Sequence, residues 1–324
     1  MSNEINSTTE MNKKFKEAIQ DFFASGKGSP MYETYVNYAL GTNMRGDILA
    51  KELSNHIPLA DRSYVDIGTA YGGFMVAFAK MGCKNVFGME IDDRLVNICR
   101  LNLQENGLNP ESVIRYDICQ PLQGKLKRKF DVITCTDVLE HVLDVPSTIN
   151  NIIALAANGS HIYLEIPNRY HVNNVLSDPH FGLFGITLLD RDDAMEYFNM
   201  ERKGEYLVGD YYNLDYFLSF FPTKFFEVVN ISNPVLPVTS DELFLNEVKN
   251  AYLEKVSNLS ISDKLKGILI ERFDQYIINY TAQMDNPDLN SYYVQSWKLI
   301  IYKKKGFVRE LLNTVSTRIS LCFP

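Results

Sequence analysis

The sequence lacks several features that would define whole classes of protein. Its five cysteines are odd in number and form no C-x-x-C pair, which argues against a disulfide framework or a zinc knuckle and fits a reducing cytoplasm. No run approaches the roughly 18 apolar residues of a membrane span, and the polar stretch from Met1 to Lys16 has no signal-peptide core. A net charge of −8 and an isoelectric point near 5.3 disfavour a broad grip on nucleic acid or anionic lipid. We therefore expect a cytoplasmic protein that has no membrane partner. Nucleic acid is also a disfavoured partner.

What the chain does have is enough apolar sequence for a full core, since 46% of its 324 residues are hydrophobic. Composition predicts a disordered tail over residues 1–12, an N-terminal helical segment over 13–62, a main domain over 63–305 and a C-terminal tail over 306–324. Within the main domain, two amphipathic stretches predict an inserted helical hairpin over 233–295. We expect this insertion to form a lid or a homodimer contact.

Short apolar strands alternate with helices in the first half of the main domain, which is typical of an α/β fold with a parallel sheet covered on both faces. The predicted strands are Ser63 to Ile67, Asn85 to Glu90, Val113 to Tyr116, Phe130 to Thr134, His161 to Ile166, Phe225 to Ile231 and Trp297 to Lys303. The predicted helices between them are Phe74 to Met81, Asp93 to Asn106, and Pro146 to Ala157, the last closing near Gly159.

The stretch from Val65 to Gly73 reads as a strand that runs into an acid and a glycine-rich turn before a helix. Glycines allow a tight turn, and the helix presents unpaired N–H groups to a ligand. Asp66 stands two residues before the first glycine, where its charge would repel the pyrophosphate of NAD but accept hydrogen bonds from the ammonium group of an amino-acid-bearing cofactor. The turn therefore favours S-adenosylmethionine over NAD.

Two further acids follow the next two strands. Glu90 could grip both ribose hydroxyls, with Ile91 beside it as an apolar wall for adenine, and Asp117 could accept from the adenine amino group, with Ile118 adjacent. Carboxyl ends of parallel strands meet at one edge of a doubly wound sheet, where ligands bind. Each acid alone also fits ordinary turn or helix-start chemistry, but three in this order favour a cofactor site.

In these motifs, and in the stretch Phe130 to Val142, which contains Asp137-x-x-Glu140-His141, the sequence resembles the class I S-adenosylmethionine-dependent methyltransferases. The resemblance covers roughly Arg45 to Arg191. It implies a Rossmann-like, mostly parallel sheet of seven strands with the last one antiparallel. One departure is Ala70, which stands where the family's glycine loop has its middle glycine. The cofactor-binding residues expected on this reading are Asp66, Gly68, Thr69, Ala70, Gly72, Glu90, Ile91, Asp117, Ile118, Thr136 and Asp137.

Asp137, Glu140 and His141 are spaced to share one face of a short helix. They fit a capping box, with Asp137 as N-cap and Glu140 at N3. They equally fit a ligand set for Mg²⁺ or another divalent ion, or a base that takes the acceptor's proton. Similar stretches bind metal in ubiquinone-pathway and small-RNA O-methyltransferases, where in the latter a later histidine completes the site; this chain offers His171 and His180 for that position.

The sequence therefore predicts an S-adenosylmethionine-dependent O-methyltransferase that acts on a hydroxyl of a small molecule, such as a sugar or a metabolite intermediate. No Asn-Pro-Pro-aromatic stretch follows the fourth strand, so a nitrogen acceptor is not favoured. Catalytic candidates are His141, His180 and Asp137; metal-ligand candidates are Asp137, Glu140, His141 and His180; acceptor-side candidates are Asn168, Arg169 and Tyr170. The alternatives are an RNA methyltransferase, an NAD-dependent oxidoreductase, and a non-catalytic scaffold that dimerises through the hairpin.

Overall fold

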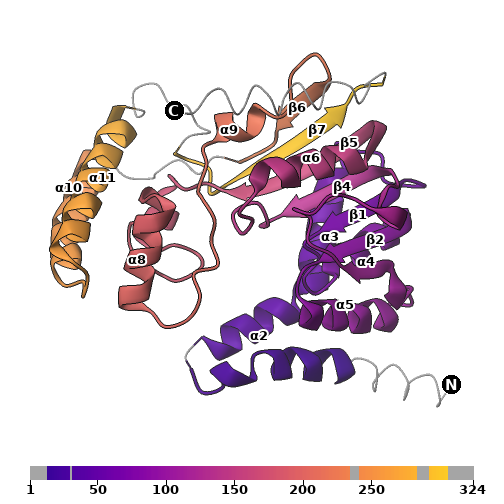
Figure 1. The fold of residues 1–324 in the computed structure, drawn as a ribbon, viewed down its shortest axis with the longest axis horizontal. Helices are drawn as coiled ribbons and strands as arrows, with labels where there is room; N and C mark the ends of the chain where they lie inside the picture. The colour runs from indigo at the N-terminus through magenta and orange to yellow at the C-terminus, as the bar shows by residue number, and fades with distance from the viewer. Residues whose placement is uncertain (1–12, 30, 234–240, 283–291, 306–324) are drawn as a thin grey trace.

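The computed structural model describes residues 13–29, 31–233, 241–282 and 292–305 (Figure 1). The tails predicted over 1–12 and 306–324 lie outside these ranges, as do parts of the predicted insertion. No helix within the described ranges is both long and apolar enough to cross a membrane.

One seven-stranded sheet forms the centre of the molecule, with strand order β3-β2-β1-β4-β5-β7-β6. All neighbours pair in parallel except β7, which runs antiparallel to both β5 and β6. This confirms the predicted mostly parallel sheet with an antiparallel last strand. The strands are β1 Ser63–Ile67, β2 Lys84–Glu90, β3 Val113–Arg115, β4 Phe130–Thr136, β5 Ala156–Pro167, β6 Phe226–Asn230 and β7 Ser296–Lys303.

Helices cover both faces of the sheet, because alternate strand residues point to opposite sides. On one face Tyr64 and Val132 pack with α3, α4 and α5, and on the other Val65 and Ile133 pack with α6 and α9. The helices are α2 Tyr32–Leu40, α3 Thr42–Ser54, α4 Gly73–Lys80, α5 Asp93–Glu105, α6 Val145–Leu155, α7 Val172–Leu176, α8 Arg191–Glu201, α9 Leu214–Leu218, α10 Asp241–Ser257 and α11 Asp263–Ala282.

The boundary between α6 and β5 differs from the prediction. The helix predicted to run to Ala157 and close near Gly159 ends at Leu155, and β5 begins at Ala156 rather than His161. Ala156 leaves the helix because it pairs with Phe130 in the parallel ladder, and Lys303 donates to its carbonyl at 2.9 Å. Both contacts come from distant parts of the chain, so helix propensity is overridden by tertiary pairing.

The paired helices α10 and α11 lie at one end of the molecule beside α8 (Figure 1). Their inward side chains, among them Tyr252, Phe273 and Tyr276, are buried against the segment that follows β5, including Val175 and Phe184. The apolar stripe of the hairpin is thus covered within this chain. The lid and homodimer roles predicted for it stay predictions.

Candidate active site

Acidic side chains from three strand ends gather at the carboxyl edge of the sheet, as expected for a doubly wound fold. Asp66 on β1 is in register with Gly88 on β2 and with Thr134 on β4. Glu90 ends β2, and Asp137 follows β4, where its N–H donates to the carbonyl of Glu165 at 3.1 Å. The structure therefore brings the predicted cofactor edge together from separate segments.

The glycine turn is shaped by close packing of protein against protein. Gly68 and Gly72 have φ values of +75° and +77°, in the left-handed region. A Cβ on Gly68 would lie 2.3 Å from a methyl group of Val138, and one on Gly72 would lie 2.5 Å from Cys99 Sγ. Both glycines are needed for this packing, a reason different from the ligand approach that the sequence suggested.

Asp66 is the most deeply buried acid at this edge, with 1% of its surface exposed. Its Oδ1 accepts from Thr134 Oγ1 at 2.6 Å, while its Oδ2 has no partner in the described part of the chain. Burial and, to a smaller extent, the charge of Glu90 raise the pKa of this carboxyl to about 7, although the hydrogen bond from Thr134 acts in the opposite direction. A buried carboxylate oxygen without a partner is suited to a cationic group such as an ammonium.

Glu90 is oriented by backbone N–H groups. Its Oε2 accepts from Ala70 at 2.9 Å, and its Oε1 accepts from Ile91 at 2.8 Å and Asp92 at 3.1 Å. These bonds tie the end of β2 to the glycine turn. Ile91 is 58% exposed at the same place, which leaves an apolar side chain facing solvent.

At the end of the third strand, the position of Ile118 differs from the expectation. Asp117 accepts from the Cys119 N–H at 2.9 Å and from Gln120 Nε2 at 3.2 Å, as a turn-forming aspartate does. Ile118 is buried in the core on the α6 side of the sheet. Of the two isoleucines expected beside adenine, only Ile91 is accessible.

The segment after β4 is a turn, so the short helix predicted from Asp137 is wrong, and the capping-box alternative is excluded with it. Asp137 has a φ of +52°, which an N-cap residue does not adopt. The helix α6 begins later, with Asp144 as its N-cap: the Asp144 side chain accepts from the Ser147 N–H at 2.9 Å, and a proline stands in the first turn.

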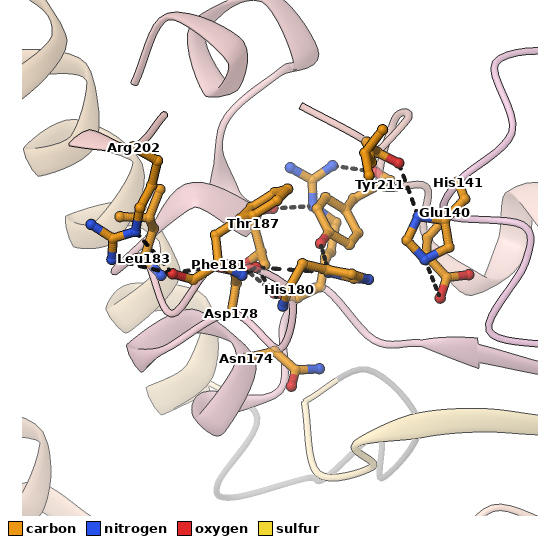
Figure 2. A network of polar contacts seen from close by, with 12 residues as sticks. Glu140, His141, Asn174, Asp178, His180, Phe181, Leu183, Thr187, Arg202 and Tyr211 are labelled. Atoms are coloured by element: carbon orange, nitrogen blue, oxygen red, sulfur yellow. Dashed lines mark hydrogen bonds and ion pairs between the residues drawn. The ribbon is translucent and has the colours of Figure 1, made fainter. Parts of the chain in front are cut away.

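This turn nevertheless places Glu140 and His141 beside His180, which belongs to the loop after α7. One possible ligand atom from each residue lies within 4.8 Å of the other two. The two imidazole rings meet edge to face, with centroids 4.9 Å apart, and His141 Nε2 lies 3.8 Å from Glu140 Oε1 (Figure 2). We call these three residues the histidine–glutamate cluster.

Each histidine of the cluster is held by a second group. His141 Nδ1 lies 2.9 Å from the Leu207 carbonyl, which can only accept, so Nδ1 carries the proton and Nε2 has a free lone pair in the neutral ring. His180 Nδ1 lies 3.2 Å from the Tyr211 hydroxyl and 3.7 Å from Asp178 Oδ1 (Figure 2). Such contacts fix ring orientation and tautomer.

Glu140 is the unusual member of the cluster. It is 3% exposed, and neither of its carboxyl oxygens has a hydrogen-bond partner in the described part of the chain. Burial, followed by the negative charge of Asp137, raises the pKa of Glu140 well above its ordinary value. Burial also lowers the pKa of His141. A cation or a shared proton would relieve the unpaired carboxyl.

Comparison with known proteins places this site in a family. The model of a methyltransferase domain family matches residues 11–210, which is more than half of the chain. The chain belongs to this methyltransferase family. Among curated relatives, the ubiquinone biosynthesis O-methyltransferase of Stutzerimonas stutzeri is 32% identical over 117 residues, covering 36% of this chain and 49% of that protein. Its counterpart in Coxiella burnetii is 28% identical over 159 residues, covering 48% and 61%. The chain thus spans about half to three-fifths of the curated relatives that it matches.

Among solved structures, the magnesium protoporphyrin IX methyltransferase of Synechocystis PCC 6803 with bound SAH has a TM-score of 0.47 at 13% identity, covering 93% of this chain and 100% of that one. A methyltransferase of Mesorhizobium loti has the same TM-score at 12% identity, covering 78% and 96%. This chain has its own seven-stranded sheet with an antiparallel strand.

Some predicted site residues of the methyltransferase lie elsewhere than expected. Asp137 is exposed and lies outside the histidine–glutamate cluster; partial desolvation of its carboxyl and the nearby charge of Glu165 raise the pKa of this carboxyl to about 6. His171, offered as the completing histidine, also lies outside the cluster. Asn168 is fully buried and donates to the Val294 carbonyl at 2.8 Å. Arg169 donates to the carbonyls of Thr187, Leu189 and Tyr211, so its guanidinium is already engaged by backbone.

Sequence reasoning missed two contributors to the site. Tyr211 holds His180, although only the aromatic richness of its segment was visible in the sequence. Arg45 on α3 stacks over Tyr38 with 3.6 Å from Cζ to the ring centroid. Its guanidinium also donates to the Tyr38 carbonyl, and its charge opposes the rise in the pKa of Asp137. Nothing local marks a lone arginine on a helix as a site residue.

Ala70 provides a stability test of the glycine turn. Its φ of +44° is left-handed, which costs a residue with a Cβ about 1–2 kcal/mol. We expect Ala70→Gly to stabilise the methyltransferase by about 0.5–1 kcal/mol, because relief of strain exceeds the added entropy of the unfolded chain. Urea unfolding measures the change. A destabilisation of similar size would show that the Ala70 methyl group makes packing contacts that outweigh the strain.

Proposed function

We propose that the methyltransferase transfers a methyl group from S-adenosylmethionine to a hydroxyl oxygen of a small molecule, and that the histidine–glutamate cluster receives the hydroxyl proton. The observation that carries this proposal is His141, whose Nδ1 faces the Leu207 carbonyl and whose Nε2 lies 3.8 Å from the buried Glu140 carboxyl in the turn after β4. The named relatives, which are ubiquinone biosynthesis O-methyltransferases, support an oxygen acceptor. The net charge of −8 offers RNA little attraction.

The residues at the strand ends fit the donor. The unpaired Asp66 Oδ2 is suited to the ammonium of its amino-acid tail, and Arg45 to the carboxylate of the same tail. Three backbone N–H groups orient the Glu90 carboxylate, which is suited to accept hydrogen bonds from the ribose hydroxyls. Ile91 is an exposed apolar side chain against which adenine can pack. When bound, the donor supplies a sulfonium that is already a good leaving group, so the protein's task is alignment and removal of one proton.

His141 is suited to that proton. Its Nδ1–H is held by the Leu207 carbonyl, and its lowered pKa keeps Nε2 unprotonated at neutral pH. His180 is oriented by the Tyr211 hydroxyl and can hold the acceptor oxygen or relay the proton. Neutral imidazole near the operating pH is an efficient general base.

The same three residues fit a divalent cation, because the unpaired Glu140 oxygens and two imidazole nitrogens form a compact set of ligand atoms. A bound cation would lower the pKa of the acceptor hydroxyl by acting as a Lewis acid, and His141 Nε2 would then be a ligand of the cation instead of the proton acceptor. Two imidazoles and one carboxylate suit Mn²⁺, Co²⁺ or Zn²⁺ better than Mg²⁺, which prefers oxygen ligands.

Metal binding can be tested without activity. When Mn²⁺ is titrated into metal-free protein, we expect the paramagnetic resonance signal of the free ion to be lost up to one equivalent, because the ion binds the cluster. The substitutions Glu140→Gln and His180→Ala should each abolish Mn²⁺ binding. Asp137→Asn is the matched control and should bind normally, since Asp137 is outside the cluster. An equal loss of Mn²⁺ binding in Asp137→Asn would show that Asp137 is a fourth ligand, as the sequence predicted. If the wild type does not bind Mn²⁺, the cluster acts as a base without a metal.

The activity is tested with S-adenosylmethionine carrying a labelled methyl group and pooled hydroxylated metabolites, including phenols, catechols and sugars. We expect S-adenosylhomocysteine to form together with a product labelled on oxygen. Failure to bind S-adenosylmethionine in calorimetry at millimolar concentration would end the proposal, and a label found on nitrogen would correct the acceptor.

A further inference from the structure

A cavity lies outside the histidine–glutamate cluster, between the loop after β5 and one face of α11. Its volume is about 450 Å³, within the range of small-molecule sites. Arg169 links the cavity to the cluster through Tyr211: it lines the cavity and donates to the Tyr211 carbonyl, while the Tyr211 hydroxyl contacts His180. Two residues, Arg169 and Tyr211, therefore separate the cavity from His180.

One wall of this cavity is aromatic. The rings of Tyr170 and Tyr276 flank Tyr292, with centroids at 5.6 Å and 5.8 Å from its ring. Tyr276 is 4% exposed, and its hydroxyl has no hydrogen-bond partner among the described residues. A buried hydroxyl without a partner costs free energy unless something else bonds to it. A ligand in the cavity is one such partner.

Polar side chains also line the cavity. Glu271, Arg272, Gln275 and Asn279 line the cavity from α11, at spacings that bring them to one side of a helix. Gln275 Nε2 donates to Asn279 Oδ1 at 2.9 Å, so the two amides are oriented together. Planar side chains of this kind present donors and acceptors in fixed directions.

The charges lining the cavity balance, which narrows the class of ligand. Arg169 and Arg272 are opposed by Asp190 and Glu271. A phosphate or carboxylate ligand would meet both acids, and a polyamine would meet both arginines. A neutral ring with many hydroxyls can donate to carboxylates, accept from amides and guanidinium groups, and lay its C–H face on tyrosine rings.

We propose that this cavity binds a neutral sugar ring, as the glycosyl part of the acceptor whose hydroxyl is methylated. The assignment to the acceptor rests on the proposed function, whereas the carbohydrate site itself does not. The sugar lies against Tyr170 and Tyr292, and one of its hydroxyls bonds the Tyr276 hydroxyl.

Saturation-transfer NMR on the full chain tests the site with methyl β-D-glucopyranoside, L-rhamnose and N-acetyl-D-glucosamine as probes, and with glucose 6-phosphate and 4-hydroxybenzoate as charged comparators. We expect at least one neutral sugar to bind, and its Kd to rise about tenfold in Tyr276→Phe and in Glu271→Gln, since each removes one hydrogen bond. Glu254→Gln, an exposed acid on α10 outside the cavity, is the matched control and should bind as wild type.

Tyr276→Phe has a second readout that separates binding from folding. Because it deletes a buried unpaired hydroxyl, its melting temperature should equal or exceed that of the wild type while sugar binding weakens. Binding of the charged comparators alone, or unchanged sugar affinity in both cavity variants, overturns the subsite. If S-adenosylmethionine binds but no sugar binds, the sugar subsite is refuted and the proposed function stands. If a sugar binds but S-adenosylmethionine does not, the proposed function is refuted and the carbohydrate site stands.

Discussion

Replacement of His141 by alanine is expected to slow methyl transfer by about 10²–10⁴-fold, the usual contribution of a positioned general base. Binding of S-adenosylmethionine should stay within about twofold, because His141 contacts Glu140 and Leu207 and none of the strand-end acids assigned to the donor. Single-turnover rates with labelled donor, paired with calorimetric Kd values, measure the two quantities separately.

His161→Gln is the matched control for this experiment. His161 lies on β5 next to the Tyr302 ring and outside the cluster, so its replacement should leave the rate unchanged. The pH profile adds a signature: burial holds the pKa of His141 below its ordinary value of 6.5, so the rate should fall only as the pH drops below about 6.5. An undiminished rate in His141→Ala would show that His141 is not the general base. The base would then be His180 or a group outside the cluster.

Replacement of Asp66 by asparagine is expected to weaken S-adenosylmethionine binding by about 10–150-fold, the effect of losing a charged hydrogen bond. Asn keeps the shape and can still accept from Thr134, but it presents no anion to the ammonium. Calorimetry measures the Kd. Asp117→Asn is the matched control, since both Asp117 oxygens already accept bonds from its own turn; a larger effect there than in Asp66→Asn would contradict the assignment.

The raised pKa of Asp66 predicts how S-adenosylmethionine affinity depends on pH. The carboxyl must ionise to hold a cation, and its pKa is about 7, so wild-type affinity should fall by up to tenfold per pH unit below about 6.5 and level off above 7.5. Binding at pH 6 should release a proton, seen as a buffer-dependent enthalpy. Because the folded pKa lies above the ordinary value of 3.8, the stability from this group without ligand is present below about pH 4 and lost as pH rises through 7.

The local features of this chain were predictable because they follow from short-range chemistry. Alternating apolar runs and helix stop signals located every strand of the sheet to within a few residues, apart from the start of β5. Acids at strand ends could be placed at one edge because parallel strands share an edge. The Glu140–His141 pair was visible from adjacency alone, although the helix expected to carry it is a turn.

Residues far apart in sequence decided the rest. His180 rather than His171 joins the pair because Asp178 accepts N–H bonds from His180, Phe181 and Leu183 and so shapes that loop. Arg169 is occupied by three carbonyls that no local pattern reveals. The pattern of strands and turns thus determined the fold and the cofactor edge, whereas tertiary packing decided which polar groups stay unpaired, because hydrogen-bond satisfaction depends on contacts between distant segments.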